Sequence, residues 1–440
     1  MARCDNSRPR EHESELIQNP ISKRQWTLPS SRSCSPGGFH GTVASTRDWF
    51  ESVAEARRRA RRRLPAPVFQ AIEAGAEAGI TRHDNVAAFA EIRFAPPLLA
   101  DLPATRDLST TVLGVPVSLP VIASPVGVQA VHPLGEVAIA RGTREAGTAM
   151  GLSEFASRPI ADVAAVNPDV FFQVHWSADR DTLLGRAERA RAQGAKALIV
   201  TLDWSFPAGR DWDSPFIPER LDMTAARKYA LPVLARPRYL AGWLRHGGLP
   251  GLTVPNIAVL GQPVLGEPVP GFFAAYRAWM DVPPPAWDDI AWLREQWGGP
   301  FMVKGVMRPD DARRAVQIGA SAVSVSNHGG NNLDGTPASV MALAGVVKAV
   351  EGQAEVLLDG GVRRGGDVVK ALALGARAVM IGRACLWGLA AGGPDGVANV
   401  FGVLRAGIDS ALRALGRSSV HELNPGDVIV PDGFNLRLDD

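Results

Sequence analysis

Short apolar segments alternate with helical patterns over most of the chain. Between the segments, apolar residues recur at the three-to-four-residue spacing of helices, as in 135–146, 180–193 and 309–319. Strands that are apolar on both faces and joined through helices pair in parallel. Eight of them favour a closed (β/α)8 barrel over an open doubly wound sheet. The expected strands are 119–125, 148–153, 170–175, 196–203, 300–305, 321–325, 355–361 and 378–383.

The chain before the first strand divides into a polar tail and a helical extension. Residues 1–44 are rich in Ser, Pro, Arg and Gly and cannot bury enough apolar surface to offset the cost of ordering, which predicts a disordered tail. Ordered structure is expected from Asp48, with one helix through Arg63 and another through about Ala78. The barrel unit is therefore expected to span residues 45–440.

Two further segments interrupt the alternation. Residues 204–285, after the fourth strand, are rich in Pro, Trp and Gly. Because a loop of this length inside a domain is usually functional, we expect a long insertion that acts as a lid. Residues 113–117, before the first strand, are expected to form a small hairpin that closes one end of the barrel.

Polar side chains recur where the strands end. In a barrel, the carboxyl ends of all strands meet at one mouth, where catalytic groups gather. This pattern predicts a site for a polar-edged cofactor and a substrate. The residues are Ser124 with Pro125, Ser153, Gln173 with His175, Thr201 with Asp203, Lys304, Ser326 with His328, Asp359, and Gly382 with Arg383.

Three of these residues carry the chemistry of an acid–base site. His328, in the glycine-rich loop after the sixth strand, can act as a base or acid near neutral pH; alternatively, it is a loop histidine that only caps or is solvated. Asp203 could orient it and stabilise its imidazolium form. Lys304 could stabilise negative charge on a reduced cofactor ring, or form a simple structural ion pair.

The last two strands lead into loops that are typical of phosphate binding. Residues 359–366 read Asp-Gly-Gly-Val-Arg-Arg-Gly-Gly, and residues 381–383 read Ile-Gly-Arg. Glycines allow backbone N–H groups to approach an anion, and arginines bind phosphate through paired hydrogen bonds. No G-x-G-x-x-G motif follows an early strand, so a dinucleotide of the Rossmann type is not expected.

Composition narrows the class of protein. The 440 residues carry a net charge of +2, which gives no strong electrostatic case for nucleic acid or a membrane. The basic run from Arg57 to Arg63 could suggest either partner or a solvated helix face. Cys4, Cys34 and Cys385 lack metal-ligand spacing and fit a reducing compartment, so no metal is expected. With no apolar run of membrane-spanning length and no secretion signal, we expect a cytoplasmic protein.

The blocks 303–305, 326–329, 358–365 and 381–383 together resemble the FMN-dependent α-hydroxy acid oxidase and dehydrogenase family, that of glycolate oxidase and the L-lactate dehydrogenase flavoproteins. The resemblance implies FMN as cofactor. It also implies that His328 is the base, paired with Asp203, and that Arg210 faces the substrate. The implied FMN-binding residues are Pro125, Val126, Gly127, Ser153, Gln173, Thr201, Lys304 and Ser326 around the flavin, Asp359 at the ribityl chain, and Gly360, Gly361, Arg363, Gly382 and Arg383 toward the phosphate.

The chain departs from the family pattern on the substrate side. Asn331 stands where the family has an arginine that grips the substrate carboxylate. His175 and Ala71 stand at the positions of two substrate-contacting tyrosines. Because asparagine carries no charge, binding of a free carboxylate should be weak. We therefore expect a substrate, contacted by Arg210, His175 and Asn331, that is not a simple 2-hydroxy acid.

Several motifs resemble one branch of the family, that of mycofactocin biosynthesis, including 209–212, 254–256, 326–337 and 384–389. The resemblance implies oxidative deamination of a Val-Tyr-derived aminolactam to an α-keto amide, with dioxygen or another acceptor reoxidising FMN. We also expect a homo-oligomer. The alternatives are an L-2-hydroxy acid oxidase or dehydrogenase that uses Arg210 for the carboxylate, and a catalytically silent flavin- or phosphate-binding barrel.

Overall fold

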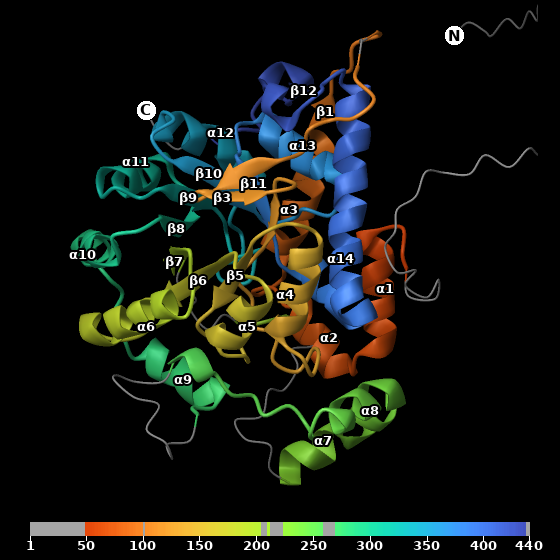
Figure 1. The fold of residues 1–440 in the computed structure, drawn as a ribbon, viewed down its shortest axis with the longest axis vertical. Helices are drawn as coiled ribbons and strands as arrows, with labels where there is room; N and C mark the ends of the chain where they lie inside the picture. Colours follow the sequence, from red (N-terminus) through yellow and green to blue (C-terminus); the bar gives the residue numbers. More distant parts are fainter. Residues whose placement is uncertain (1–48, 100–101, 204–208, 212–222, 258–268, 437–440) are drawn as a thin grey trace, which may run out of the picture. The chain divides into compact units, whose positions relative to one another are not determined.

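The centre of the fold is a closed barrel of eight parallel strands (Figure 1). The computed structural model describes residues 49–99, 102–203, 209–211, 223–257 and 269–436. Around the barrel the strand order is β10-β11-β4-β5-β6-β7-β8-β9, which follows the chain, so the (β/α)8 prediction is confirmed. The strands are β4 (Val121–Ala123), β5 (Met150–Ser153), β6 (Val170–His175), β7 (Ala197–Thr201), β8 (Phe301–Val306), β9 (Ala322–Val325), β10 (Glu355–Asp359) and β11 (Ala378–Ile381).

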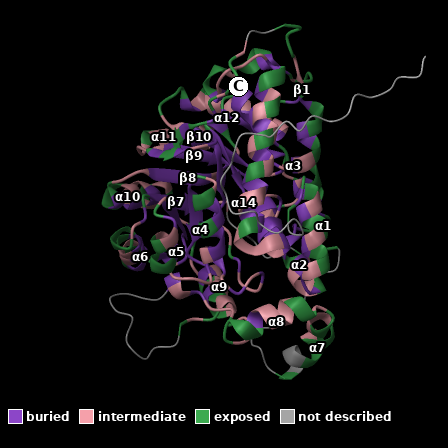
Figure 2. Ribbon diagram, turned by 45° about the vertical axis from the view of Figure 1, so that its right-hand side comes forward, coloured by how far each residue is buried: buried purple, intermediate pink, exposed green. Residues whose placement is uncertain are grey.

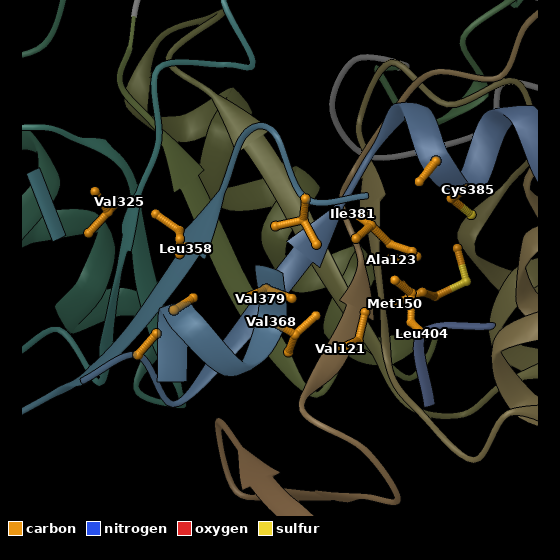
Figure 3. Packing of buried hydrophobic residues seen from close by; sticks show 14 of the residues in the cluster. Val121, Ala123, Met150, Val325, Leu358, Val368, Val379, Ile381, Cys385 and Leu404 are labelled. Carbon is orange, nitrogen blue, oxygen red and sulfur yellow. The ribbon is translucent and has the colours of Figure 1, made fainter. Parts of the chain in front are cut away.

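Helices surround the strands and pack on their outward-facing side chains. Val379 and Ile381 of β11, for example, belong to the same buried cluster as Val368 of α13 and Cys385 and Leu404 of α14 (Figure 3). Figure 2 shows the strands as the most buried part of the fold. These helices are α4 (Glu136–Glu145), α5 (Ile160–Val166), α6 (Arg180–Ala192), α10 (Trp287–Trp297), α11 (Pro309–Gln317), α12 (Ser339–Val350), α13 (Gly365–Ala373) and α14 (Arg383–Ala414).

The inward-facing side chains form a separate core that is closed by a hairpin. The strands β2 (Thr110–Val112) and β3 (Val115–Val117) pair antiparallel around a Leu113-Gly114 turn with φ of 50° and 79°. Their apolar residues cluster with inward residues such as Phe171 and with residues that begin strands, such as Ala378. The hairpin therefore closes the amino-terminal end of the barrel, as predicted. The carboxyl-terminal end of the barrel is not closed by the hairpin and can hold a binding site.

The N-terminal extension contains three helices, α1 (Val53–Arg63), α2 (Ala66–Ile72) and α3 (Ile80–Glu91). Helix α1 lies beside α14 (Figure 1). The expectation that the second helix reaches Ala78 is wrong, because α2 ends at Ile72 and the residues after it form hydrogen bonds outside the helix. Beyond Ile72, the N–H of Ala76 donates to the carbonyl of Gly330 at 2.9 Å, which ties this segment to the loop after β9. Helix α3 was not expected.

The basic run lies on helix α1. Arg57 pairs with Glu73 at 2.8 Å, and Arg58 and Arg59 pair with Glu55 at 2.8 and 3.0 Å. These contacts bring part of the positive charge of the run against carboxylates of the same N-terminal extension. A further small sheet joins the two ends of the ordered unit, where β1 (Arg93–Phe94) pairs antiparallel with β12 (Val428–Ile429).

The described part of the insertion is mostly helical. It contains α7 (Met223–Leu234), α8 (Pro237–Arg245), a 3-10 turn (Pro255–Ile257) and α9 (Phe272–Met280). Helix α9 packs on the loop after β5, where the rings of Phe155 and Trp279 lie 5.4 Å apart. The lid remains a prediction, since parts of 204–285 lie outside the described residues, as does the predicted tail 1–44.

Candidate active site

A cavity of about 290 Å³ opens at the carboxyl ends of the barrel strands. Its lining comes from the last residues of the barrel strands and the loops that follow them, from the end of α2 and the segment after it, and from the first turn of α14. Most residues predicted from the sequence border it. They are Pro125, Val126, Gly127, Ser153, Gln173, His175, Lys304, His328, Asn331, Asp359, Gly360, Gly361, Arg363, Gly382 and Arg383.

Lys304, Ser326 and Asp359 form a buried polar cluster beneath the cavity. The Lys304 ammonium donates to Ser326 Oγ at 2.8 Å and lies 3.1 Å from Asp359 Oδ2, and Ser326 Oγ donates to Asp359 Oδ1 at 2.7 Å. Burial lowers the pKa of Lys304, but the charges of Asp359 and Asp203 outweigh it and hold the pKa above its ordinary value. The site therefore contains a fixed positive charge at neutral pH.

His328 and Asp203 form a hydrogen-bonded pair at the rim of the cavity. His328 Nδ1 lies 3.2 and 3.1 Å from the two carboxylate oxygens of Asp203, so Nε2 is the nitrogen left for the cavity. Burial raises the pKa of Asp203, but the charges of His328 and Lys304 outweigh it and hold the pKa below its ordinary value. The arrangement is that of a general base oriented by an ionised carboxylate.

The loop that carries His328 has an unusual backbone. His328 has a positive φ of 55°, and the two glycines that follow it, Gly329 and Gly330, have φ of 63° and 76°. A side chain at Gly330 would collide with the Arg82 backbone at 2.5 Å. Three consecutive left-handed residues turn the chain sharply, so that His328 and Asn331 both border the cavity.

Two half-buried arginines border the end of the cavity formed by β10 and β11. Burial and the nearby charge of Arg383 lower the pKa of Arg363 to about 9, and burial lowers that of Arg383 to about 10. Neither guanidinium forms an ion pair with a carboxylate among the described residues. Arg363 stacks on Trp387 at 4.8 Å, and Arg383 donates to the carbonyls of Ile72, Ala74 and Gly329. An anion between them would offset the repulsion.

Some predicted residues lie behind the lining rather than in it. Thr201 accepts a hydrogen bond from Gln173 at 2.6 Å, and Ser326 and Asp203 support the groups described above. Arg210, in the described segment 209–211, forms a parallel backbone bridge with Glu77. Burial lowers its pKa.

Two groups of residues behind the cavity lining support the site and were not predicted from the sequence. Asn85 of α3 exchanges hydrogen bonds of 2.8 and 3.1 Å with Asn327, and also accepts from the N–H of Ser339 at the start of α12. Glu154 and Arg186 form a buried ion pair of 3.0 Å beside His175. The sequence does indicate Glu154, because it is a carboxylate directly after the strand residue Ser153. No feature of the sequence indicates that Asn85 pairs with Asn327.

The described residues contain no group of three or more His, Cys, Asp or Glu side chains that could hold a metal ion. Within the same ranges, no helix has the length and apolar character needed to cross a membrane.

Comparison with known proteins defines the class. Residues 60–430 match the model of the FMN-dependent dehydrogenases, so the chain belongs to this family of FMN-dependent oxidoreductases, and the predicted cofactor FMN is confirmed. The chain is 60% identical over 390 residues to pre-mycofactocin synthase of Mycolicibacterium smegmatis, covering 89% of this chain and 96% of that protein. The resemblance to the mycofactocin branch is thereby confirmed.

More distant relatives share the fold. An L-lactate oxidase of Nostoc is 37% identical over 373 residues, covering 83% of this chain and 94% of that protein. The crystal structure of the monotopic membrane protein (S)-mandelate dehydrogenase superposes with a TM-score of 0.75 at 31% identity, covering 87% of this chain and 100% of the other.

Proposed function

We propose that this enzyme oxidises the amine-bearing carbon of the Val-Tyr-derived aminolactam and yields the α-keto amide of mycofactocin biosynthesis. The substrate loses two electrons and two protons to form an imine, and water then replaces the nitrogen, which leaves as ammonia. Support comes from the pre-mycofactocin synthase relatives at 60% identity. FMN, when bound, supplies the two-electron acceptor, from which dioxygen or another acceptor takes the electrons.

The residues of the cavity fit FMN. Gln173 Oε1 is a buried acceptor with no hydrogen-bond partner among the described residues, as a ligand N–H donor would require. Arg363 and Arg383 form no ion pair with a carboxylate among the described residues, and a phosphate would sit beside them near the N-terminus of α14. The 125–127 segment, Ser153, Thr201, Lys304 and Ser326 would then surround the ring, Asp359 the ribityl chain, and Gly360, Gly361 and Gly382 the phosphate end.

His328 is the base of this reaction. Its Nε2 accepts a proton from the substrate, from the amine or from the adjacent carbon, while Asp203 stabilises the resulting imidazolium through Nδ1. Lys304 holds its positive charge next to the site throughout, because Asp359 fixes it at 3.1 Å. Helix α9 excludes water from the β5–β6 side of the mouth, where Trp279 covers His175 at 4.4 Å between ring centres.

Asn331 is the observation that carries the choice of substrate. Its Oδ1 is buried and lacks a hydrogen-bond partner among the described residues, and the residue borders the cavity three positions after His328. An amide oxygen at this place accepts from an N–H donor and repels a carboxylate. A lactam N–H or an amine satisfies it, whereas the carboxylate of a 2-hydroxy acid would meet a neutral amide that supplies no charge to hold it.

The alternative function is oxidation of an L-2-hydroxy acid, with Arg210 as the partner of the carboxylate. The Nostoc L-lactate oxidase relative favours it. The charge of Arg210 contributes to the lowered pKa of Arg383, a residue of the cavity.

The test mixes the FMN-loaded protein, without oxygen, with the aminolactam or with L-lactate and follows the loss of flavin absorbance. We expect reduction by the aminolactam alone. Reduction by lactate alone would establish the alternative, and reduction by neither would refute both. Asn331→Arg should improve the response to lactate by roughly 10- to 100-fold, the value of a charged hydrogen bond, with Asn331→Gln as the uncharged control.

A further inference from the structure

A second imidazole–carboxylate pair lies in the cavity wall, separate from His328 and Asp203. His175, the last residue of β6, is 7% exposed, and its Nδ1 lies 3.1 Å from Glu154 Oε1. The same carboxylate oxygen accepts from the backbone N–H of His175 at 2.7 Å, and Arg186 pairs with the other oxygen at 3.0 Å. Burial raises the pKa of Glu154, but His175 and Arg186 outweigh it and hold the pKa below its ordinary value.

This pair determines the hydrogen bonding of Gln173. An ionised Glu154 only accepts, so His175 Nδ1 must carry a proton, and in the neutral ring Nε2 is an acceptor. The amide nitrogen of Gln173 lies 2.9 Å from His175 Nε2 and 2.6 Å from Thr201 Oγ1 and can donate to both. The amide oxygen is then directed away from these partners and has none among the described residues.

We propose that Glu154, His175 and Gln173 form a positioning relay in which a proton on His175 sets the direction of the Gln173 amide. The amide direction in turn decides whether the chain presents an acceptor or a donor to FMN. The proposal rests on the assignment of Gln173 to the cofactor site in the proposed function, but not on the identity of the substrate.

The two protonation states of His175 require opposite amide directions. The imidazolium has N–H donors at both nitrogens, and a donor at Nε2 cannot face the NH₂ group of Gln173. Rotation of the amide by half a turn places Oε1 toward His175 and the NH₂ group toward the cavity. Thr201 is satisfied in either case because a hydroxyl both donates and accepts.

The residues around His175 hold its imidazole in place, so it remains next to the Gln173 amide in both protonation states. The rings of Trp279 and Phe155 lie 4.4 and 5.5 Å from the imidazole and hold its plane. The charged groups around it are Glu154 and Arg186, and Asp203 with its partners His328 and Lys304 is near enough for the charge of His175 to lower the pKa of Asp203.

The test measures the Kd of FMN by quenching of its fluorescence between pH 5.5 and 8.5. The FMN phosphate loses its second proton at about pH 6 and contributes the same pH dependence in every variant. Beyond that shared part, we expect for the wild-type protein one step of about tenfold, with tighter binding at high pH, because one buried hydrogen bond is exchanged for an unpaired group. His175→Phe keeps the ring packing on Trp279 but cannot take up a proton, so the step should disappear. His175→Gln, which also cannot be protonated, serves if the phenylalanine variant does not fold.

Two controls identify the source of the step. His328→Gln should keep it, since His328 bonds to Asp203 and Ser326 rather than to Gln173. His421→Gln removes an exposed histidine and should also keep it. A wild-type pH dependence of Kd no larger than that of both His175 variants would overturn the relay, as would loss of the extra step in His328→Gln. Because FMN alone is the probe, failure of the aminolactam as a substrate would leave these outcomes unchanged.

Discussion

Asp203→Asn is the substitution that tests the carboxylate behind His328. It removes a charge while keeping the shape of a side chain whose oxygens lie 3.1 and 3.2 Å from His328 Nδ1. Asp203 is closely packed against Gly305, since a β-carbon on Gly305 would lie 2.6 Å from Asp203 Cβ. A substitution that keeps the size of the Asp203 side chain is therefore needed. An effect on the reaction would therefore report the lost charge rather than altered packing.

The expected effect follows from the charge separation. Two opposite unit charges about 4 Å apart interact by about 4 kcal/mol at the effective dielectric constant of a protein surface. The side chain of His328 is 32% exposed, so solvent screens part of this interaction. We take the remainder as about 2–3 kcal/mol, which corresponds to a proton transfer slowed by about 30- to 150-fold. Because the pKa of Asp203 is held below its ordinary value, the wild-type advantage should persist throughout neutral pH and be lost only in acid.

The assay is anaerobic stopped-flow reduction of the flavin by the aminolactam, with FMN content checked from the absorbance spectrum. Asp409→Asn is the matched control, since it removes a carboxylate that pairs with Arg106 at 2.6 Å outside the cavity. The control should reduce at the wild-type rate. A rate for Asp203→Asn within about threefold of wild type, with FMN fully bound, would refute the role of the carboxylate.

Three further predictions concern the scaffold. Phe171→Ala, inside the barrel, should lower the free energy of unfolding in urea by about 3–5 kcal/mol. Gly365→Ala should destabilise strongly, because its β-carbon would lie 2.2 Å from the Gly407 backbone, whereas Gly402→Ala on α14 meets nothing within 4 Å and should be neutral or stabilising; thermal melting compares the two. Burial raises the pKa of Cys385 to about 12, so mass spectrometry should find it unmodified by maleimide at pH 7.5 until the protein unfolds.

The barrel and most of the cavity lining were predictable because both follow from local pattern. Each strand is a short apolar run, and parallel pairing brings all carboxyl ends to one side, so Gln173, Lys304 and Asp359 had to meet. The hairpin at Leu113-Gly114 was equally local. None of these inferences needed a contact between specific distant side chains.

The contacts that failed prediction join distant segments. Asn85 and Asn327 are 242 positions apart, and nothing in either segment alone indicates that their amides pair. The end of α2 is set by a hydrogen bond from Ala76 to Gly330, which lies in the loop after β9. Arg383 was expected at a phosphate, yet its guanidinium also ties α2 to that loop through backbone carbonyls, a role that only the fold reveals.

Two of the three departures from the family pattern, Asn331 and His175, act on different partners. Asn331 replaces a charge by an amide whose oxygen has no partner among the described residues, so its consequence falls on the substrate. His175 replaces a tyrosine by a group that bonds to Gln173 at 2.9 Å, and it is accompanied by a buried carboxylate that a neutral phenol would not need. A change made only to fit a new substrate would leave Gln173 untouched. In the proposed relay the second departure therefore acts on the cofactor side of the cavity, and FMN affinity across pH separates it from the first.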